Sequence, residues 1–243
     1  MSANNRFYLI TITAVLAILS TLALGRWQLS RAAQKEALQA AMDSQSQRAP
    51  LGAQALAALT VPADAAPALH RLVKLRGAWV GDKTVFLDNR QMNAKPGFYV
   101  VTPFLPDGAV TAVLVQRGWV ARNFLDRTTL PSITTLAGTV ELTGRIAPPP
   151  GKLYELGSTD TGAIRQNLDV VQFSAETGLA LVAVSIVQTD PAGDGLLRDW
   201  PQVASTAAKN YGYAFQWFGL SALISILYVW FQIGKRFKNA HRA

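Results

Sequence analysis

Two long apolar runs dominate the pattern of hydrophobic and polar positions. Residues 7–25 and 213–233 are 19 and 21 residues long, and neither run contains a charged side chain. As helices that rise about 1.5 Å per residue, both would cross a hydrocarbon core of roughly 30 Å. The pattern predicts two transmembrane helices, one near each end of the chain.

Each run has an alternative interpretation. The alternative for the second is a buried core helix, although its length, its lack of charge and its aromatic ends are typical of a membrane span. The first resembles a cleavable signal peptide, because Ala23-Leu24-Gly25 is an acceptable cleavage site. Against cleavage, small residues recur at every fourth position and favour close packing of two helices. The stripe consists of Thr13, Ala17, Thr21 and Gly25, with Ser221 and Ser225 as the matching positions in the second run.

The residue composition between the two apolar runs changes twice along the chain. Strong helix formers continue from the first run, so residues 26–46 are expected to extend the helix. Residues 47–68 are rich in Ala and Pro, which indicates a linker with a short helix at 52–59. A β-rich domain is expected over residues 69–212.

Alternating apolar and polar positions predict about six strands in this domain. They cover residues 69–80, 84–90, 98–105, 109–120, 138–148 and 179–189. One helix is expected at 169–177, with Asp169 as its N-cap and Gly178 at its end. Many short strands with little helix favour an antiparallel β-barrel or sandwich. The expected fold class is an α+β membrane protein, with two transmembrane helices flanking an extracytoplasmic β domain.

The charge distribution indicates orientation. Of 23 basic residues, four lie in the tail 234–243 and one is Arg6, which leaves 18 basic against 15 acidic residues in between. A basic flank favours the cytoplasmic side, so residues 1–6 and the tail are expected inside and the β domain outside. The basic excess is thus a membrane signal, and no nucleic-acid partner is expected.

Few residues offer catalytic or metal chemistry. The chain has no cysteine and two histidines, His70 and His241, which the topology would place on opposite sides of the membrane. No HExxH, GxSxG, P-loop or GxGxxG pattern occurs. The sequence therefore predicts neither an enzyme nor a metal site.

Arginine and tryptophan point to recognition instead. Guanidinium groups pair bidentately with carboxylates, such as haem propionates or acidic partner residues. The alternative for each arginine is a solvated side chain at the end of a strand. The candidates at the first helix end are Trp27 and Arg31, and those in the β domain are Arg90, Arg117 and Trp119, with Trp79, Arg145 and Arg165 as further members.

Five segments together resemble one protein family. They are GRWQLSR at 25–31, FLDNRQMNAKPGFYVVTPF at 86–104, VLVQRGWV at 113–120, QNLD at 166–169 and YGYAFQWFGL at 211–220. In this order they resemble the surfeit-locus cytochrome c oxidase assembly factors, with the bacterial members most similar. The resemblance covers most of the chain outside residues 47–68.

The resemblance implies a bacterial inner-membrane protein with a periplasmic β domain and both termini in the cytoplasm. It implies a chaperone that assists haem a insertion into the main oxidase subunit, with haem A synthase as a further partner. Members commonly carry a histidine, discussed as a haem ligand, three residues before the tyrosine matched by Tyr213. This chain has Asn210 there, and an amide is a poor iron ligand. Gln216 and Trp217 would complete the lining of a haem site.

Two other functions remain open. The protein would be a carrier of haem a if aromatic contacts around Asn210 sufficed to hold the porphyrin. A membrane-anchored haem-modifying enzyme is the third class, although the sequence shows neither a candidate base nor a metal cluster for it. In the physical interpretation that needs no haem, the aromatic residues before and within 213–233 form an interfacial belt.

Overall fold

The computed structural model describes residues 3–123, 129–154, 162–200 and 204–234. The chain forms two compact units. The helical unit contains helix α1 (Ala3–Ser46) as far as residue 40, helix α5 (Ala204–Tyr228) and the π-helical turn η3 (Val229–Gly234). The second unit, residues 41–201, is the β domain.

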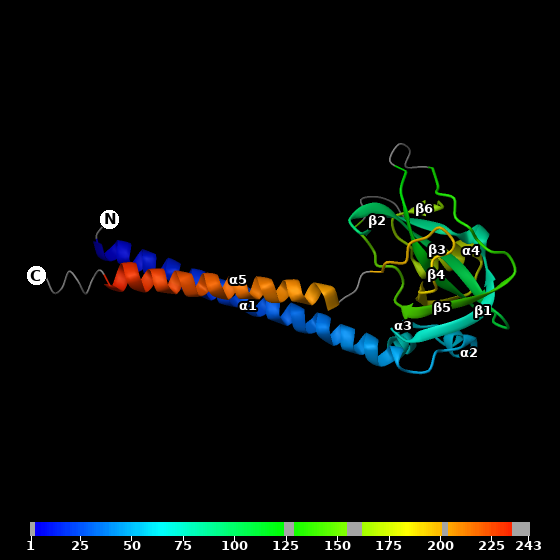
Figure 1. Cartoon of the computed structure of the whole chain (residues 1–243), viewed down its shortest axis with the longest axis horizontal. Coiled ribbons are helices and arrows are strands. Elements are labelled where there is room, and N and C mark those ends of the chain that lie inside the picture. Colours follow the sequence, from blue (N-terminus) through cyan, green and yellow to red (C-terminus); the bar gives the residue numbers. More distant parts are fainter. Residues whose placement is uncertain (1–2, 124–128, 155–161, 201–203, 235–243) are drawn as a thin grey trace, which may run out of the picture. The chain divides into compact units, whose positions relative to one another are not determined.

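The helical unit is an antiparallel pair in which α5 runs alongside α1 (Figure 1). Both helices are long and apolar enough to cross a membrane, over Asn4–Ser46 and Ala207–Gln232. Only 11% of the most apolar window of α5 is buried, so α5 is not a buried core helix. The helix expected over residues 26–46 is continuous with the first apolar run.

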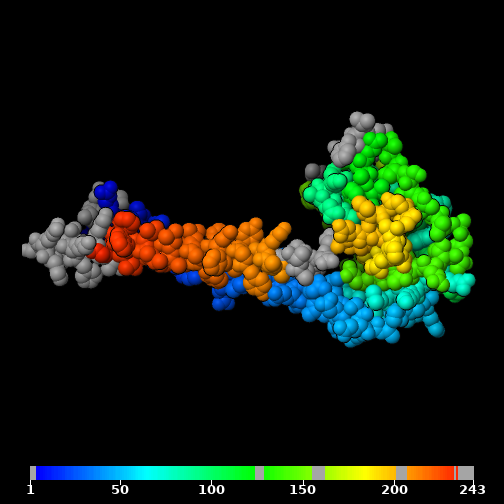
Figure 2. All heavy atoms as spheres, in the orientation of Figure 1, coloured from blue at the N-terminus to red at the C-terminus, as the bar shows by residue number. Residues whose placement is uncertain are grey.

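The contact between the two helices follows a seven-residue repeat. Between residues 7 and 35 the less exposed positions of α1 alternate in steps of four and three, as in a coiled coil, with Ala17 as an additional partly buried position. The alternating positions are Phe7, Thr11, Ala14, Ile18, Thr21, Gly25, Gln28, Ala32 and Lys35. Atoms of α5 lie against those of α1 in the space-filling view (Figure 2). At Gly25 an added Cβ would lie 2.6 Å from the ring of Phe218, so the glycine permits close approach.

The predicted small-residue stripe is therefore only partly correct. Thr21 and Gly25 are buried in the seam, and Ser221 of α5 is 4% exposed. Thr13 is exposed, and its hydroxyl donates a hydrogen bond to the carbonyl of Leu9 on its own helix. A strict four-residue spacing drifts around a helix, whereas alternate steps of four and three stay on one face.

Residues 47–68 carry more structure than a linker needs. They contain helix α2 (Ala53–Ala57), helix α3 (Pro62–Ala65) and the 3-10 turn η1 (Ala66–Ala68). Leu51, Leu56 and Leu59 are buried in the main hydrophobic cluster of the β domain, and Leu51 forms a parallel bridge with Val73. The segment therefore covers part of the barrel.

Seven strands form one sheet in the order β1-β5-β7-β4-β3-β2-β6, and an additional β1–β3 pairing closes it into a barrel. The predicted six strands all occur, and the two-residue β6 is the addition. The strands are β1 (Leu72–Trp79), β2 (Val85–Met92), β3 (Lys95–Pro106), β4 (Ala112–Ala121), β5 (Thr139–Ala147), β6 (Ile164–Arg165) and β7 (Leu181–Gln188). The 3-10 turn η2 (Gly81–Lys83) precedes β2.

The sheet is mixed, so the expectation of an antiparallel sheet was wrong in two places. β7 runs parallel to β4, and β6 runs parallel to β2. Parallel neighbours need a crossover connection instead of a hairpin. The chain from β4 to its parallel neighbour β7 passes through β5 and then through the segment that includes α4 (Val170–Thr177).

Helix α4 confirms its sequence prediction. The side chain of Asp169 accepts hydrogen bonds from the backbone N–H groups of Val171 and Gln172, and Gly178 ends the helix with φ 71°.

The two Val-x-Leu-x-Gly segments, residues 73–77 and 140–144, are partners in the barrel. In the antiparallel pair of β1 and β5, Val73 lies opposite Gly144 and Gly77 lies opposite Val140. A Cβ at Gly77 would collide with the carbonyl of Leu105. The glycine thus permits the crossing of β1 and β3 that closes the barrel.

Candidate functional site

The predicted residues at the start of α5 divide between two faces of the helix. Asn210 and Trp217 are partly buried on the face toward α1, whereas Tyr213 is 52% exposed and Gln216 is exposed. A site that needs all four side chains around one ligand is therefore not formed in this structure.

Asn210 makes two hydrogen bonds to α1. Its Nδ2 donates to Oε1 of Gln28 over 2.6 Å, and its Oδ1 accepts from Nζ of Lys35 over 2.6 Å. On the next residue, the hydroxyl of Tyr211 donates to Glu36 over 2.9 Å. The side chain at position 210 therefore serves the helix pair.

This arrangement does not fit a haem held by an axial ligand at position 210. An amide is a poor iron ligand, and here both of its polar atoms already have partners on α1. His70 lies in the β domain, where partial burial and the nearby Arg145 lower its pKa. His241 lies outside the described residues.

Trp27 and Arg31 point away from the α5 contact. Trp27 is 56% exposed, and Arg31 is exposed and donates to Oε1 of Gln34 on its own helix. They are accessible to a partner or to lipid headgroups.

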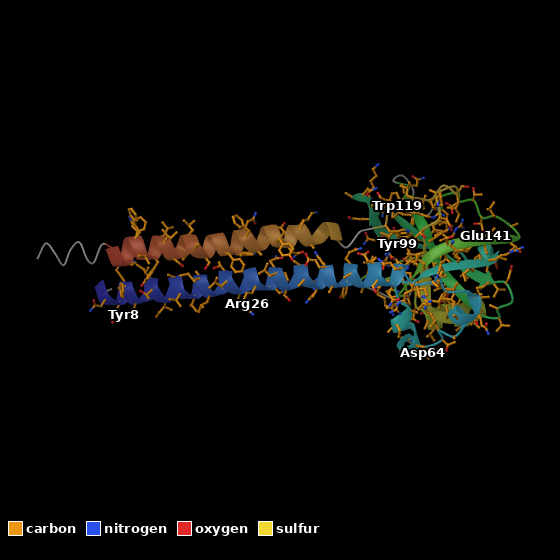
Figure 3. All side chains as sticks on the ribbon, turned by 60° about the horizontal axis from the view of Figure 1, so that its bottom comes forward. Tyr8, Arg26, Asp64, Tyr99, Trp119 and Glu141 are labelled. Carbon is orange, nitrogen blue, oxygen red and sulfur yellow. The ribbon has the colours of Figure 1, made fainter. Side chains whose placement is uncertain are left out.

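In the β domain, the structure brings together Arg90 and Trp119 (Trp119 is labelled in Figure 3). Nε1 of Trp119 donates to the carbonyl of Arg90 over 2.9 Å, and the Arg90 guanidinium donates to the carbonyl of Gln166 over 3.0 Å. Two aromatic residues that sequence reasoning missed complete the cluster. The Arg90 guanidinium lies 6.0 Å from the ring centre of Tyr99, and Tyr99 contacts Trp200 edge to face at 5.3 Å. We call Arg90, Tyr99, Trp119 and Trp200 the Arg90 cluster.

A β-bulge positions Arg90. The pairing of β2 with β3 shifts between Leu87 and Arg90, and Asn89 has φ 59°. Bulges re-aim the following side chain and are frequent next to functional sites. The Asp88-Asn89 pair, which tolerates such backbone, was the available signal in the sequence.

The Arg90 guanidinium is buried without a carboxylate partner among the described residues. The residue is 8% exposed, and its Nε has no hydrogen-bond partner in the part of the chain that the structure describes. Burial lowers the pKa of Arg90 and raises that of Tyr99. A buried cation is costly unless it is paired, so this side chain is suited to receive an anionic group.

Arg117 belongs to a separate cluster in which its charge is balanced. It is 2% exposed, lies 4.8 Å from the ring centre of Trp79, and pairs with Asp194 over 3.2 Å. Arg198 pairs with the same carboxylate over 2.6 Å. Burial lowers the pKa of Arg117, and Asp194 opposes this shift. Arg117 therefore has a structural partner, and the structure does not join it to Arg90 and Trp119 in one surface.

The remaining two arginines also have local roles. Arg165 pairs with Glu176 over 3.1 Å and lies 5.3 Å from the ring centre of Phe173. Arg145 approaches the sulfur of Met42 at 3.9 Å, and burial lowers its pKa.

A cavity of about 540 Å³ lies beside the start of α4. Its lining is mostly apolar, with Pro149, Pro150, Leu168 and Leu181 among the members, and the ion pair of Lys152 and Asp169 is part of it. This lining suits an apolar group and contains no acid–base pair beyond that salt bridge. Sequence analysis gave no sign of this cavity.

Comparison with known proteins identifies related chains. The profile of the SURF1 family matches residues 15–222. A "SURF1-like protein" of Drosophila melanogaster is 30% identical over 238 residues, which cover 89% of this chain and 75% of that protein. A "SURF1-like protein" of Rickettsia bellii is 28% identical over 235 residues, covering 89% of this chain and 88% of the relative. The "Cytochrome oxidase assembly protein SHY1" of Saccharomyces cerevisiae is 30% identical over 105 residues, 41% of this chain and 25% of the yeast protein.

Proposed function

The chain belongs to the SURF1 family, and from this membership we propose that it is an assembly factor for cytochrome oxidase. The observation that carries the proposal is the family match over residues 15–222, which includes the whole β domain and part of each apolar helix. The yeast relative, whose name states a role in cytochrome oxidase assembly, supports the same function. We infer a binding role rather than catalysis.

The protein acts from the membrane in this proposal. Both α1 and α5 have the length and composition of membrane spans, and most of their side chains are exposed in the structure, as lipid-facing side chains would be. The basic residues after α5 favour a cytoplasmic C-terminus. Two spans then place the N-terminus inside and the β domain in the periplasm of a bacterial cell.

The Arg90 cluster is the proposed docking contact of the β domain. A guanidinium that is 8% exposed and lacks a carboxylate partner in the described part of the chain is matched by an acidic side chain of a partner. Tyr99 and Trp200 of the cluster are partly exposed, and tyrosine and tryptophan are among the residues that dominate the binding energy of protein interfaces. Trp119 is 3% exposed and supports Arg90 from within the fold. The proposed partner is the main oxidase subunit at the stage of haem a insertion.

The experiment is co-purification of the tagged protein with the main oxidase subunit, with haem measured in the same detergent-solubilised sample. The proposal predicts that the subunit is recovered, and that haem in the sample scales with the subunit and not with the tagged protein. Haem bound to the tagged protein alone would favour the carrier function. Absence of the oxidase subunit from the sample would contradict the docking proposal.

A further inference from the structure

One polar layer interrupts the contact between α1 and α5. Most buried seam positions carry small or apolar residues, such as Ala32, Ala207 and Ala214, which are at most 5% exposed. Asn210 lies in the same seam and bonds Gln28 and Lys35 of α1. We call these three residues the amide clasp.

The polarity of the clasp follows from its chemistry. A lysine ammonium only donates hydrogen bonds, so the oxygen of Asn210 has to face Lys35. The NH₂ group of Asn210 then faces Gln28, which accepts through Oε1. The short side chain of asparagine offers one acceptor and one donor group, so it can bond Lys35 and Gln28 at the same time.

The clasp also fixes a position along the helices. Gln28 and Lys35 are seven residues apart on one face of α1, and the fully buried Ala32 lies between them. A slide by one helical turn, about 5.4 Å, would therefore move Asn210 out of reach of both partners. Two further hydrogen bonds form in the same register. Tyr211 bonds Glu36 beside the clasp, and Thr11 bonds Tyr228 near the other end of the helix pair.

The small residues of the seam specify register weakly, because they recur along both helices. The packing of the Phe218 ring on Gly25 is a second contact that depends on the register, but it contains no polar group. A single buried asparagine is known to select register in coiled coils. Polar groups between membrane helices also stabilise their association.

We propose that the amide clasp sets the register of α5 against α1, and that Asn210 is a positioning residue and not a ligand. The clasp excludes the shifted pairings that the small-residue seam would tolerate. The outer faces of the helix pair are thereby presented in one fixed arrangement.

The chain has no cysteine, so engineered cysteine pairs report the register without background. The pair Thr11→Cys with Tyr228→Cys tests the observed register, because the Thr11 hydroxyl lies 2.9 Å from the hydroxyl of Tyr228. The tyrosine ring is longer than a cysteine side chain, so a short bismaleimide is needed to bridge the two thiols. The pair Thr11→Cys with Ser221→Cys tests a slide by one repeat. Both are measured as the yield of intramolecular cross-link with that reagent in the full-length protein in membranes.

Asn210→Leu and Gln28→Leu are expected to lower the first yield roughly threefold to tenfold and to raise the second, as the strength of interhelical hydrogen bonds suggests. Gln216→Leu is the matched control, because it removes an exposed amide from the same helix and should change neither yield. The exchange Gln28→Asn with Asn210→Gln keeps the combined reach of the two amides. The double exchange should restore the yield that Gln28→Asn alone or Asn210→Gln alone lowers. A general loss of stability would not explain such a rescue.

Unchanged cross-link yields in Asn210→Leu would overturn the proposal. Failure of the exchange to rescue the single changes would overturn it as well. Haem ligation is tested separately. Asn210→His, purified from a host that makes haem a, is expected to show no added Soret band. A bound Soret band together with unchanged register would contradict the proposal, because it would show that position 210 is open to a ligand.

Discussion

At the scale of single residues, the buried arginines Arg90 and Arg117 differ in what balances their charge. Arg117 shares Asp194 with Arg198, whereas Arg90 has no carboxylate partner in the described residues. The first arrangement is expected to serve stability and the second to serve binding, because only an unbalanced buried cation gains from an added anion.

Substitution of each arginine by methionine separates these roles. In Arg90→Met the loss of one hydrogen bond is offset by removal of a buried charge, so the free energy of unfolding should change by less than about 1 kcal/mol. Assembled oxidase should nevertheless fall in cells that carry this variant. Thermal unfolding of the full chain in detergent and the oxidase absorption spectrum are the two measurements.

Arg117→Met is the matched control. It breaks a buried pair and should destabilise the protein by about 2–4 kcal/mol, a value reduced from the full cost because Arg198 still neutralises Asp194. If Arg90→Met left oxidase levels normal while Arg117→Met lowered them, docking through the Arg90 cluster would be refuted.

At the scale of elements, local signals were predictable and distant contacts were not. The caps of α4 lie within ten residues of sequence, so Asp169 and Gly178 identified its ends. The parallel pairing of β4 with β7 joins segments far apart in the chain, and nothing local marks it. The Ala- and Pro-rich composition of residues 47–68 suggested a linker, while the spaced leucines Leu51, Leu56 and Leu59 were the overlooked sign of packing.

The cap of α4 gives a prediction with a pH dependence. Asp169→Ala should lower the free energy of unfolding by about 1 kcal/mol near neutral pH, through loss of the N-cap. The hydrogen bond from Lys152 lowers the pKa of Asp169 in the folded state, so the carboxylate stabilises the fold above its unfolded pKa of about 4. The stability difference between the two proteins should therefore shrink as the pH falls below about 4.

Asp169→Asn is the control for this measurement, because it keeps the capping oxygen but removes the charge. It should be less destabilised than Asp169→Ala and should lose the pH dependence. Equal stability of Asp169→Ala and the parent protein at neutral pH would contradict the capping role.

The helix pair gives a prediction at the same scale. Gly25→Val would place new atoms against the ring of Phe218, which already lies 2.6 Å from an ideal Cβ at residue 25. We expect the bismaleimide cross-link yield of the Thr11→Cys and Tyr228→Cys pair to fall, because the helices must separate. The second change Phe218→Leu should restore part of the yield, whereas an additive loss in the double variant would argue against this contact.

At the scale of the whole molecule, the sequence alone is sufficient to identify the family. Five segments that follow one another in the order typical of the family carry the resemblance. The sequence did not reveal how the recognition residues are grouped. Arg117 and Asp194 are 77 residues apart, and Asn210 lies 182 residues from Gln28, so their pairing depends on the complete fold.

Asn210, at the position where the resemblance led us to expect a haem ligand, illustrates the same limit of the sequence. The asparagine alone left open whether a haem site with a weaker ligand remained at the start of α5. Its two hydrogen bonds join α5 to α1, so both polar atoms of the side chain are engaged in the helix contact. This observation favours a docking function over haem ligation at position 210.

The most direct test of the assembly function is the haem a content and amount of assembled oxidase in a strain that lacks this gene. We predict that both fall, and that they recover with the parent gene but not with Arg90→Met. Normal oxidase spectra and normal haem a content in the deletion strain would contradict the proposed assembly function.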